Sequence, residues 1–531
     1  MRQGFSRRDL MKGASVAGLF TALSTPSAAK AWCWEDFRHD FKDVDLPSRL
    51  LPHPVIRGNP NHDRYWDEVR EAFPLPRKGR YCHYNTGTTG SQPFFSINNL
   101  AVYNLYKSRD PVFWQNNLAD DFPDLFEVSP ETTGSHQTAI YNELAAMFNG
   151  NPDEFVLTYN TSDGMQSCTT GTKWNSGDRI ITTNLEHPCG EGSVAWARDN
   201  YGVSVSVVSI PFDGGFNMSV ADFVHLFQSA FEAPRPAGAK QMLVFSHISY
   251  RNGFVFPAKE LTELAHSYPN TWVMIDSAHG WGQLPVDCKD IGADFVSGAG
   301  HKWLCGGPGT GILYVRNSSG SYPLIPFNPW TEGWGNLFTV PSARFNDATH
   351  NGVRGTPTLT SGMQSRGEWN RCASFAMADS ARFFNSIGTR TIYNRGLEMA
   401  AYFQKKVVQR WGESALWVRR TADQRFKGFV TAFNPFQGNT NPANYAAQSA
   451  AIGTIVNNLG ASIDRNLNPT RKTPIYLASR NWANTYADGR SNRAALRVST
   501  HAMYTSKDET DFVIDEIAKQ VDLSGLPQLR P

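Results

Sequence analysis

Short apolar runs and helical stretches alternate through the first part of the chain. The apolar runs are typical of buried strands and occupy residues 155–158, 179–183, 203–210, 242–245, 272–275 and 312–315. Between several of them, apolar positions recur at helical spacing, as in 220–231 and 258–266. Strands that alternate with helices predict an α/β fold with a mostly parallel sheet and helices on both faces.

The flanking segments have a different pattern. Before the alternating region, helical spacing predicts helices near residues 62–72, 97–107 and 140–148. After a long helix predicted at 361–387, further helices are expected near 398–411 and 445–459, with strands near 428–433 and 474–478. The last part of the chain therefore predicts a smaller α+β domain.

The first residues have the pattern of an export signal. The twin-arginine pair Arg7 and Arg8 precedes an apolar run at 13–23, and Ala29 and Ala31 form a small-x-small cleavage site. The apolar run is too short to span a bilayer as a helix, so no stable membrane anchor is expected. Twin-arginine export carries folded proteins, and we therefore predict that this machinery delivers the protein to the periplasm with any cofactor already inserted.

These patterns together predict four parts. They are a signal peptide at 1–31, an N-terminal arm at 32–83, a large domain at 84–345 and a small C-terminal domain at 346–531.

Composition excludes several classes of partner and site. Fifty basic and 48 acidic residues give a net charge of +2, which offers no reason to expect a nucleic-acid partner. The seven cysteines are scattered and odd in number, so they describe neither a disulfide framework nor a zinc site. No metal ion is expected.

Two residues at predicted strand ends carry the candidate chemistry. Asp276 ends the strand at 272–275, and Lys302 lies next to His301 among small residues between two apolar strands. A partly desolvated lysine serves as a Schiff-base nucleophile. An aspartate can hold a pyridinium nitrogen protonated, which makes a pyridoxal ring an electron sink. Ligands in such sheets bind outside the carboxyl ends of the strands, where Thr161, His187, His247, Asp276 and Lys302 all fall.

The segments Asp-Ser-Ala-His at 276–279 and Ala-Gly-His-Lys at 299–302 resemble those of the class V aminotransferase family. The Glu-His step at 186–187, the Gly-Thr-Pro at 355–357 and the motif around Arg497 extend this resemblance over roughly residues 84–511. It implies a pyridoxal-phosphate enzyme of fold type I. Such an enzyme has a seven-stranded, mostly parallel sheet in the large domain and active sites shared across a homodimer. The isopenicillin N epimerase-like branch resembles this chain best.

The resemblance also implies roles for individual residues. Lys302 would form the Schiff base and transfer the proton, Asp276 would pair with the pyridine nitrogen, and His187 would stack on the ring. The expected cofactor-binding set is completed by Thr161, Ser162, Ala278, His279, His301 and, across the dimer, Thr356. Arg497 would bind the substrate's carboxylate with its guanidinium fork, together with Asn85 and Arg480.

The turn at 160–166 has two interpretations from its residues alone. A Thr/Ser/Gly turn that opens a helix presents free backbone N–H groups to a phosphate. A plain helix N-cap explains Ser162 or Asp163 equally well.

Departures from the family pattern limit the function. Cysteine desulfurases carry a nucleophilic cysteine shortly before the closing arginine motif, whereas no cysteine follows Cys372 here. Ala299 also replaces the family's frequent serine three residues before the lysine. We expect a reaction at the α-carbon of an amino acid or peptide amino group, either epimerisation or an oxidative decarboxylation that tailors a peptide natural product. The alternatives are a periplasmic class V aminotransferase and a non-enzymatic periplasmic binding protein, although the latter would not need Asp276 and Lys302 together.

Overall fold

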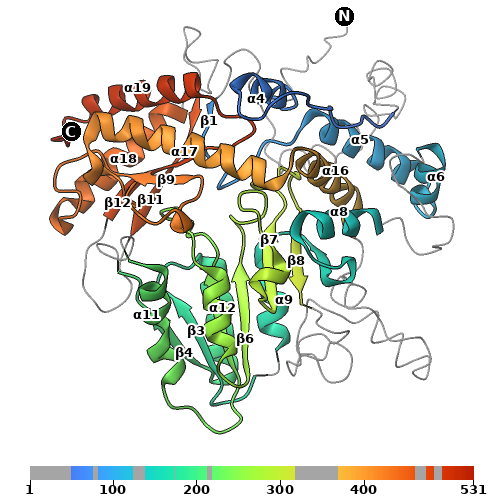
Figure 1. Ribbon diagram of the computed structural model, residues 1–531, viewed down its shortest axis with the longest axis horizontal. Coiled ribbons are helices and arrows are strands. Elements are labelled where there is room, and N and C mark those ends of the chain that lie inside the picture. The colour runs from blue at the N-terminus through green and yellow to red at the C-terminus, as the bar shows by residue number, and fades with distance from the viewer. Residues whose placement is uncertain are drawn as a thin grey trace, which may run out of the picture. The chain divides into compact units, whose positions relative to one another are not determined.

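The computed structural model describes residues 49–75, 82–122, 138–172, 174–211, 218–316, 369–460, 474–482 and 493–531 (Figure 1). These residues belong to one compact unit, Arg49–Pro531. The predicted signal peptide, the predicted domain boundary at 345 and Thr356 lie outside the described residues. Within the described ranges, no helix is both long and apolar enough to cross a membrane.

A seven-stranded sheet forms the centre of the fold. Its strands are β2 (Phe155–Thr158), β3 (Arg179–Thr183), β4 (Ser204–Val208), β5 (Gln241–Ser246), β6 (Thr271–Asp276), β7 (Phe295–Ala299) and β8 (Gly311–Val315). Their order across the sheet is β2-β8-β7-β6-β5-β3-β4. β8 is antiparallel to both of its neighbours, and the other neighbouring pairs are parallel. The prediction of an α/β fold with a seven-stranded, mostly parallel sheet is confirmed.

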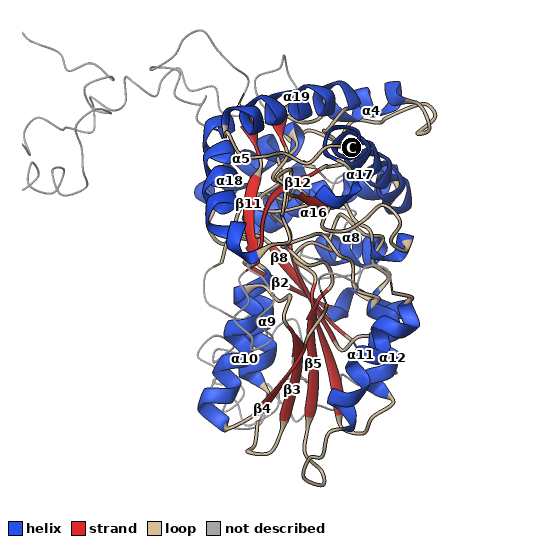
Figure 2. Ribbon diagram, turned by 90° about the vertical axis from the view of Figure 1, so that its left-hand side faces the viewer, coloured by secondary structure: helices blue, strands red, loops and turns tan. Residues whose placement is uncertain are grey.

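Helices cover both faces of this sheet. Figure 2 shows α9 (Thr161–Gly171) and α10 (Pro188–Tyr201) on one side and α11 (Val220–Glu232) and α12 (Ala258–His266) on the other. Successive side chains of a strand point to opposite faces. In β5, Met242 and Val244 therefore join one apolar cluster and Leu243 and Phe245 another. Burial on both faces explains why the strand reads as a continuous apolar run.

A second, smaller sheet is antiparallel and has the order β11-β12-β9, with β9 (Val430–Phe433), β11 (Ala478–Trp482) and β12 (Arg493–Ser499). In β12, Leu496 and Val498 pack with apolar residues of α17 (Thr389–Trp411), α18 (Tyr445–Gly460) and α19 (Lys507–Leu523). Arg497 lies between them and therefore projects from the opposite face. Near the start of the described chain, β1 (Cys82–His83) pairs in parallel with β10 (Ile475–Tyr476).

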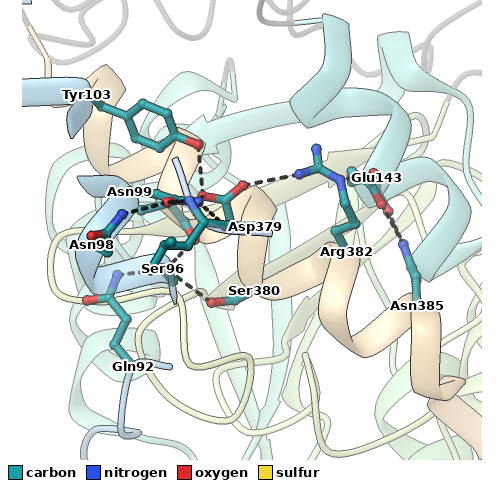
Figure 3. Close-up of polar contacts among 12 residues, drawn as sticks. Gln92, Ser96, Asn98, Asn99, Tyr103, Glu143, Asp379, Ser380, Arg382 and Asn385 are labelled. Carbon is teal, nitrogen blue, oxygen red and sulfur yellow. Dashed lines mark hydrogen bonds and ion pairs between the residues drawn. The ribbon is translucent and has the colours of Figure 1, made fainter. Parts of the chain in front are cut away.

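Further helices are α4 (Asp63–Arg70), α5 (Phe94–Arg109), α6 (Trp114–Asp121), α8 (Thr138–Phe148), α13 (Cys288–Ile291) and α16 (Arg371–Ile387). A buried polar network joins α5, α8 and α16 (Figure 3). The Asp379 carboxylate accepts hydrogen bonds from Tyr103 Oη at 2.8 Å and Asn99 Nδ2 at 3.0 Å, and Arg382 bridges Asp379 to Glu143. Each carboxylate in this network is thus paired or hydrogen-bonded, as burial of a charge requires.

Two predicted helices have different bounds in the structure. The helix predicted at 361–387 begins at Arg371, where the Asn370 side chain caps it by accepting from the Ala373 N–H. The helix predicted at 398–411 begins nine residues earlier, at Thr389, and contains Gly396. A Cβ on Gly396 would lie 2.0 Å from the Phe429 ring, so only glycine fits at this position. A glycine weakens the helical pattern in the sequence, and the first part of the helix was therefore not predicted.

Candidate active site

The carboxyl ends of the central strands bring the predicted site residues together. Asp276 is the last residue of β6, and Lys302 follows β7 by three residues. The Cys189 thiol lies 3.8 Å from Asp276 Oδ2 and also contacts the Ser162 side chain, which connects the first turns of α9 and α10 with the end of β6. The structure therefore brings Ser162, Asp276 and the neighbour of His187 together.

The turn that carries Lys302 is held from several directions. Within it, Cys305 N–H donates to the Lys302 carbonyl at 3.2 Å. From outside, Gly90 N–H donates to the His301 carbonyl at 2.8 Å, and Ser380 of the buried polar network donates to the Cys305 carbonyl at 3.1 Å. A Cβ on Gly90 would lie 2.0 Å from the Lys302 carbonyl oxygen, so this approach requires glycine.

Lys302 has the electrostatic environment of a reactive amine. Its pKa is lowered to about 8: burial is the largest cause and the Arg497 guanidinium acts in the same direction, while the Asp276 carboxylate opposes both effects. Desolvation disfavours the ammonium form, so a substantial fraction of this amine is neutral near physiological pH. A neutral amine is the form that attacks a carbonyl.

Asp276 is 3% exposed. Its Oδ1 accepts the Ala278 backbone N–H at 2.9 Å, which gives Ala278 a role in orienting the carboxylate. Burial raises the pKa of Asp276, whereas the Ala278 N–H and the Lys302 charge lower it. Because the Ala278 N–H binds Oδ1, the other carboxylate oxygen, Oδ2, is left to bind a different group.

His187 is the N-cap of α10. Its Nδ1 accepts the Cys189 backbone N–H at 3.2 Å, and its ring meets Tyr250 edge to face at a centroid distance of 4.8 Å. Because Nδ1 accepts, the proton of the neutral ring is assigned to Nε2. Burial and the Lys302 charge lower the pKa of His187 to about 4, so the ring is neutral at physiological pH.

The start of α9 has the properties of an anion site. Thr161 is buried at the helix N-terminus, and its Oγ1 has no hydrogen-bond partner among the described residues. A helix N-terminus favours negative charge because its backbone N–H groups are free. His301 is only partly buried, and its Nδ1 lies 3.2 Å from the Thr310 carbonyl.

His279 is buried beside the site, but one ring nitrogen is used by the protein. Trp303 Nε1 donates to His279 Nδ1 at 3.2 Å. The charges on Lys302 and Arg497 are close enough to lower the pKa of His279, although burial is the larger cause. Its predicted contact with a cofactor stays a prediction.

The three predicted substrate residues are also near one another. Arg497 is 1% exposed and donates from Nη2 to Asn85 Oδ1 at 2.7 Å and from Nη1 to the Tyr250 carbonyl at 3.0 Å. Arg480 lies over the Tyr250 ring, with its guanidinium carbon 5.7 Å from the centroid.

Three residues of the site were not assigned a role from the sequence. Tyr250 contacts His187, Arg480 and Arg497, and Cys189 touches both His187 and Asp276. Glu186 is fully buried and accepts from the Thr183 and Ser246 hydroxyls, and burial raises its pKa to about 8. Glu186 and Cys189 are close to His187 in the sequence, and this proximity could have indicated that they belong to the site. Nothing in the sequence indicated that Tyr250 belongs to it.

Residues 128–433, more than half of the chain, match the model of the family described as Aminotransferase class-V. The chain belongs to this family. Its cofactor is pyridoxal 5'-phosphate. The residues present fit this class V cofactor, because Thr161 offers an unpartnered hydroxyl at a helix N-terminus and Lys302 and Asp276 lie at the adjoining strand ends.

Several relatives of this class V protein have names that suggest activities. A probable cysteine desulfurase of Methanothermobacter thermautotrophicus is 32% identical over 32% of this chain and 40% of its own length. Another, of Halobacterium salinarum, is 27% identical over 53% of this chain and 62% of its own length. The chain thus spans less than two thirds of both. Isopenicillin N epimerase of Streptomyces clavuligerus is 22% identical over 66% of this chain and 80% of its own length.

Solved structures share the class V fold. The cystine C–S lyase C-DES, in complex with cysteine persulfide, has a TM-score of 0.61 at 17% identity and covers 86% of this chain and 100% of its own. The cysteine desulfurase CsdA from Escherichia coli has a TM-score of 0.61 at 16% identity and covers 88% of this chain and 99% of its own.

Proposed function

We propose that the protein is an exported, homodimeric class V enzyme that acts at the α-carbon of an amino acid or of a peptide's amino group. The observation that carries the proposal is the grouping of Lys302, whose pKa burial lowers to about 8, with Asp276 and the buried Arg497. When bound, pyridoxal phosphate withdraws electrons from the bonds of the substrate's α-carbon.

The chain's own residues would bind the substrate and move its proton. Lys302 is suited to accept a proton from the α-carbon and to return it, because a general base works best when its pKa lies near the operating pH. Arg497 would hold the substrate's carboxylate and fix which bond at the α-carbon faces Lys302. Asp276, oriented by the Ala278 N–H, would keep the pyridine nitrogen protonated.

Thiol chemistry of the desulfurase kind is not favoured in this chain. Cys189 contacts the site, but burial and the nearby Asp276 raise the pKa of its thiol to about 12, so the nucleophilic thiolate is scarce. The sequence also has no cysteine after Cys372. We therefore propose either epimerisation, the reaction in the name of isopenicillin N epimerase, or an oxidative decarboxylation with dioxygen as the electron acceptor, which tailors a peptide natural product. Class V transamination is the second candidate.

The first test is cofactor attachment. Borohydride treatment of the purified protein should fix the cofactor covalently, and peptide mass spectrometry should locate it on Lys302. A protein that binds no pyridoxal phosphate would overturn the proposal.

The second test identifies the reaction. An exported enzyme meets few 2-oxo acids, so we expect turnover on secreted peptides of the host without an added acceptor. Unchanged mass with inverted configuration indicates an epimerase, and loss of carbon dioxide indicates a decarboxylating oxidase. A single turnover that resumes only when a 2-oxo acid is added identifies an aminotransferase instead.

Export and assembly are tested separately. Changing Arg7 and Arg8 together to lysine should retain the protein in the cytoplasm, whereas Arg2→Lys should not. Sedimentation of the mature protein should give the mass of two chains. If the amount of protein in the periplasmic fraction is the same for the double variant as for the wild type, the twin-arginine export route is wrong.

A further inference from the structure

Three arginines gather around one aromatic ring at the edge of the site. The guanidinium of Arg251 lies 5.0 Å from the centroid of the Tyr250 ring, and that of Arg480 lies 5.7 Å from it. Arg497 donates to the carbonyl of the same tyrosine at 3.0 Å. Three positive charges therefore meet beside the position where the substrate's α-carbon would lie.

The contacts that the described residues make with two of these arginines are all neutral. Arg497 donates to the Asn85 amide oxygen, the Thr88 hydroxyl and the Tyr250 carbonyl, and Arg480 donates to the Ser479 carbonyl at 2.7 Å. The Nε atoms of Arg480 and Arg497 are buried and have no partner in the described part of the chain.

These charges also repel one another. Burial is the largest cause that lowers the pKa of Arg497, and the charge of Arg480 lowers it further, while Arg251 acts on Arg480 in the same direction. A buried charge that lacks a counter-charge is costly. An anionic ligand would relieve both the repulsion and the missing hydrogen bonds.

Strand register places two of the arginines side by side. In the antiparallel pair β11–β12, Arg480 is opposite Ala495 and Ala478 is opposite Arg497. Arg480 and Arg497 are thus diagonal neighbours on one face of the sheet, and such positions lie about 7–8 Å apart. Both guanidiniums also contact Tyr250, so a short amino dicarboxylate can reach the two together.

Both arginines also act on the catalytic lysine. Each lowers the pKa of Lys302 and that of His187, so both face the same site. One α-carboxylate leaves one of the two guanidiniums without a counter-charge. A second carboxylate on the substrate would complete the pairing.

We propose that the site selects an α-amino acid, free or at a peptide terminus, that carries a second carboxylate of the aspartyl or glutamyl type. Arg497 binds the α-carboxylate and Arg480 binds the side-chain carboxylate, while Arg251 adds positive charge. This proposal rests on the proposed function, because that function places the substrate at Lys302.

The test compares matched ligands that differ by one charge. The holoenzyme is titrated with L-glutamate and L-glutamine, and with L-aspartate and L-asparagine, and the change in cofactor absorbance gives each Kd. The borohydride-reduced enzyme, which cannot turn over, is titrated with glutarate and with its monoamide by calorimetry. Hydrogen bonds to charged groups lead us to expect at least a tenfold tighter Kd for the more anionic member of each pair.

Variants assign the preference to Arg480. Arg480→Gln should abolish the difference between the glutamate and glutamine Kd values, and Arg480→Lys should retain part of it. Arg425→Gln, at an exposed arginine paired with Asp423, is the control and should change neither Kd. Far-UV circular dichroism checks that each variant is folded.

Two failures are distinguishable. If pyridoxal phosphate attaches to Lys302 but the wild-type enzyme binds glutamate and glutamine equally, the dicarboxylate proposal is wrong and the proposed function stands. If the preference exists but survives in Arg480→Gln, the assignment to Arg480 is wrong. If no cofactor attaches to Lys302, the proposed function itself fails.

Discussion

The amine of Lys302 provides a direct test of the electrostatics of the site. Burial is the main cause that lowers its pKa from 10.5 to about 8. At pH 8 about half of this amine is neutral, compared with about 0.3% for a lysine of ordinary pKa, which is a difference of about 150-fold. Asp276→Asn should move the midpoint below 8, because the carboxylate raises it, and Arg497→Gln should move it upward.

Competitive labelling measures this midpoint residue by residue. The apoenzyme and its two variants are labelled with a trace of acetic anhydride at a series of pH values, and peptide mass spectrometry quantifies each lysine. Limited access can slow labelling of Lys302 without displacing its pH midpoint. Lys259, whose pKa the Asp290 carboxylate raises, is the internal reference in the same sample.

The outcome decides whether burial activates the lysine. A Lys302 midpoint near that of Lys259 would refute the reasoning, because the amine would then be as hydrated as a surface lysine. A midpoint near 8 that does not respond to Asp276→Asn would show that the carboxylate is too far away to act on the amine.

Three further predictions concern stability and packing. Gly90→Ala would place a methyl group 2.0 Å from the carbonyl oxygen of the active-site lysine, so cofactor affinity and melting temperature should both fall, whereas Gly453→Ala, with open space around it, should lower neither. Tyr103→Phe removes a donor to the buried Asp379 carboxylate and should reduce the free energy of unfolding in urea by about 1.5–3 kcal/mol. Burial lowers the pKa of His247 from 6.5 to about 4, so the unfolded chain binds more protons in this range and stability should fall as the pH decreases from 6.5 to 4. For this histidine alone the loss is about 3 kcal/mol, and a urea midpoint that does not change over this range would contradict its neutral burial.

The sequence predicted those features that depend on local patterns. The strand at 179–183 and the helix at 258–266 have the predicted bounds, because burial of one or both faces leaves a regular apolar pattern. Asp276 and Lys302 were recognisable as candidates because both follow such strands. The beginning of α17 was missed because Gly396 serves the packing of Phe429, which is distant in sequence.

Features that depend on tertiary proximity were not predictable in the same way. The diagonal relation of Arg480 and Arg497 follows from the register of β11 and β12, which no local pattern records. Tyr250 acquires its importance only because residues from three separate segments contact it. The predicted role of Thr356 lies outside the described residues and stays a prediction.

The short segment from Tyr84 to Gly90 has a consequence for the order of folding. Its partners are far along the chain: the Tyr84 carbonyl accepts from the Ser499 N–H, Asn85 accepts from Arg497, and Gly90 donates to the His301 carbonyl. Contacts of such high sequence separation must offset a large loop-closure entropy, so they form late. A nascent chain that ends before β12 offers Tyr84 and Asn85 none of these partners, so this segment reaches its native contacts only after synthesis is nearly complete.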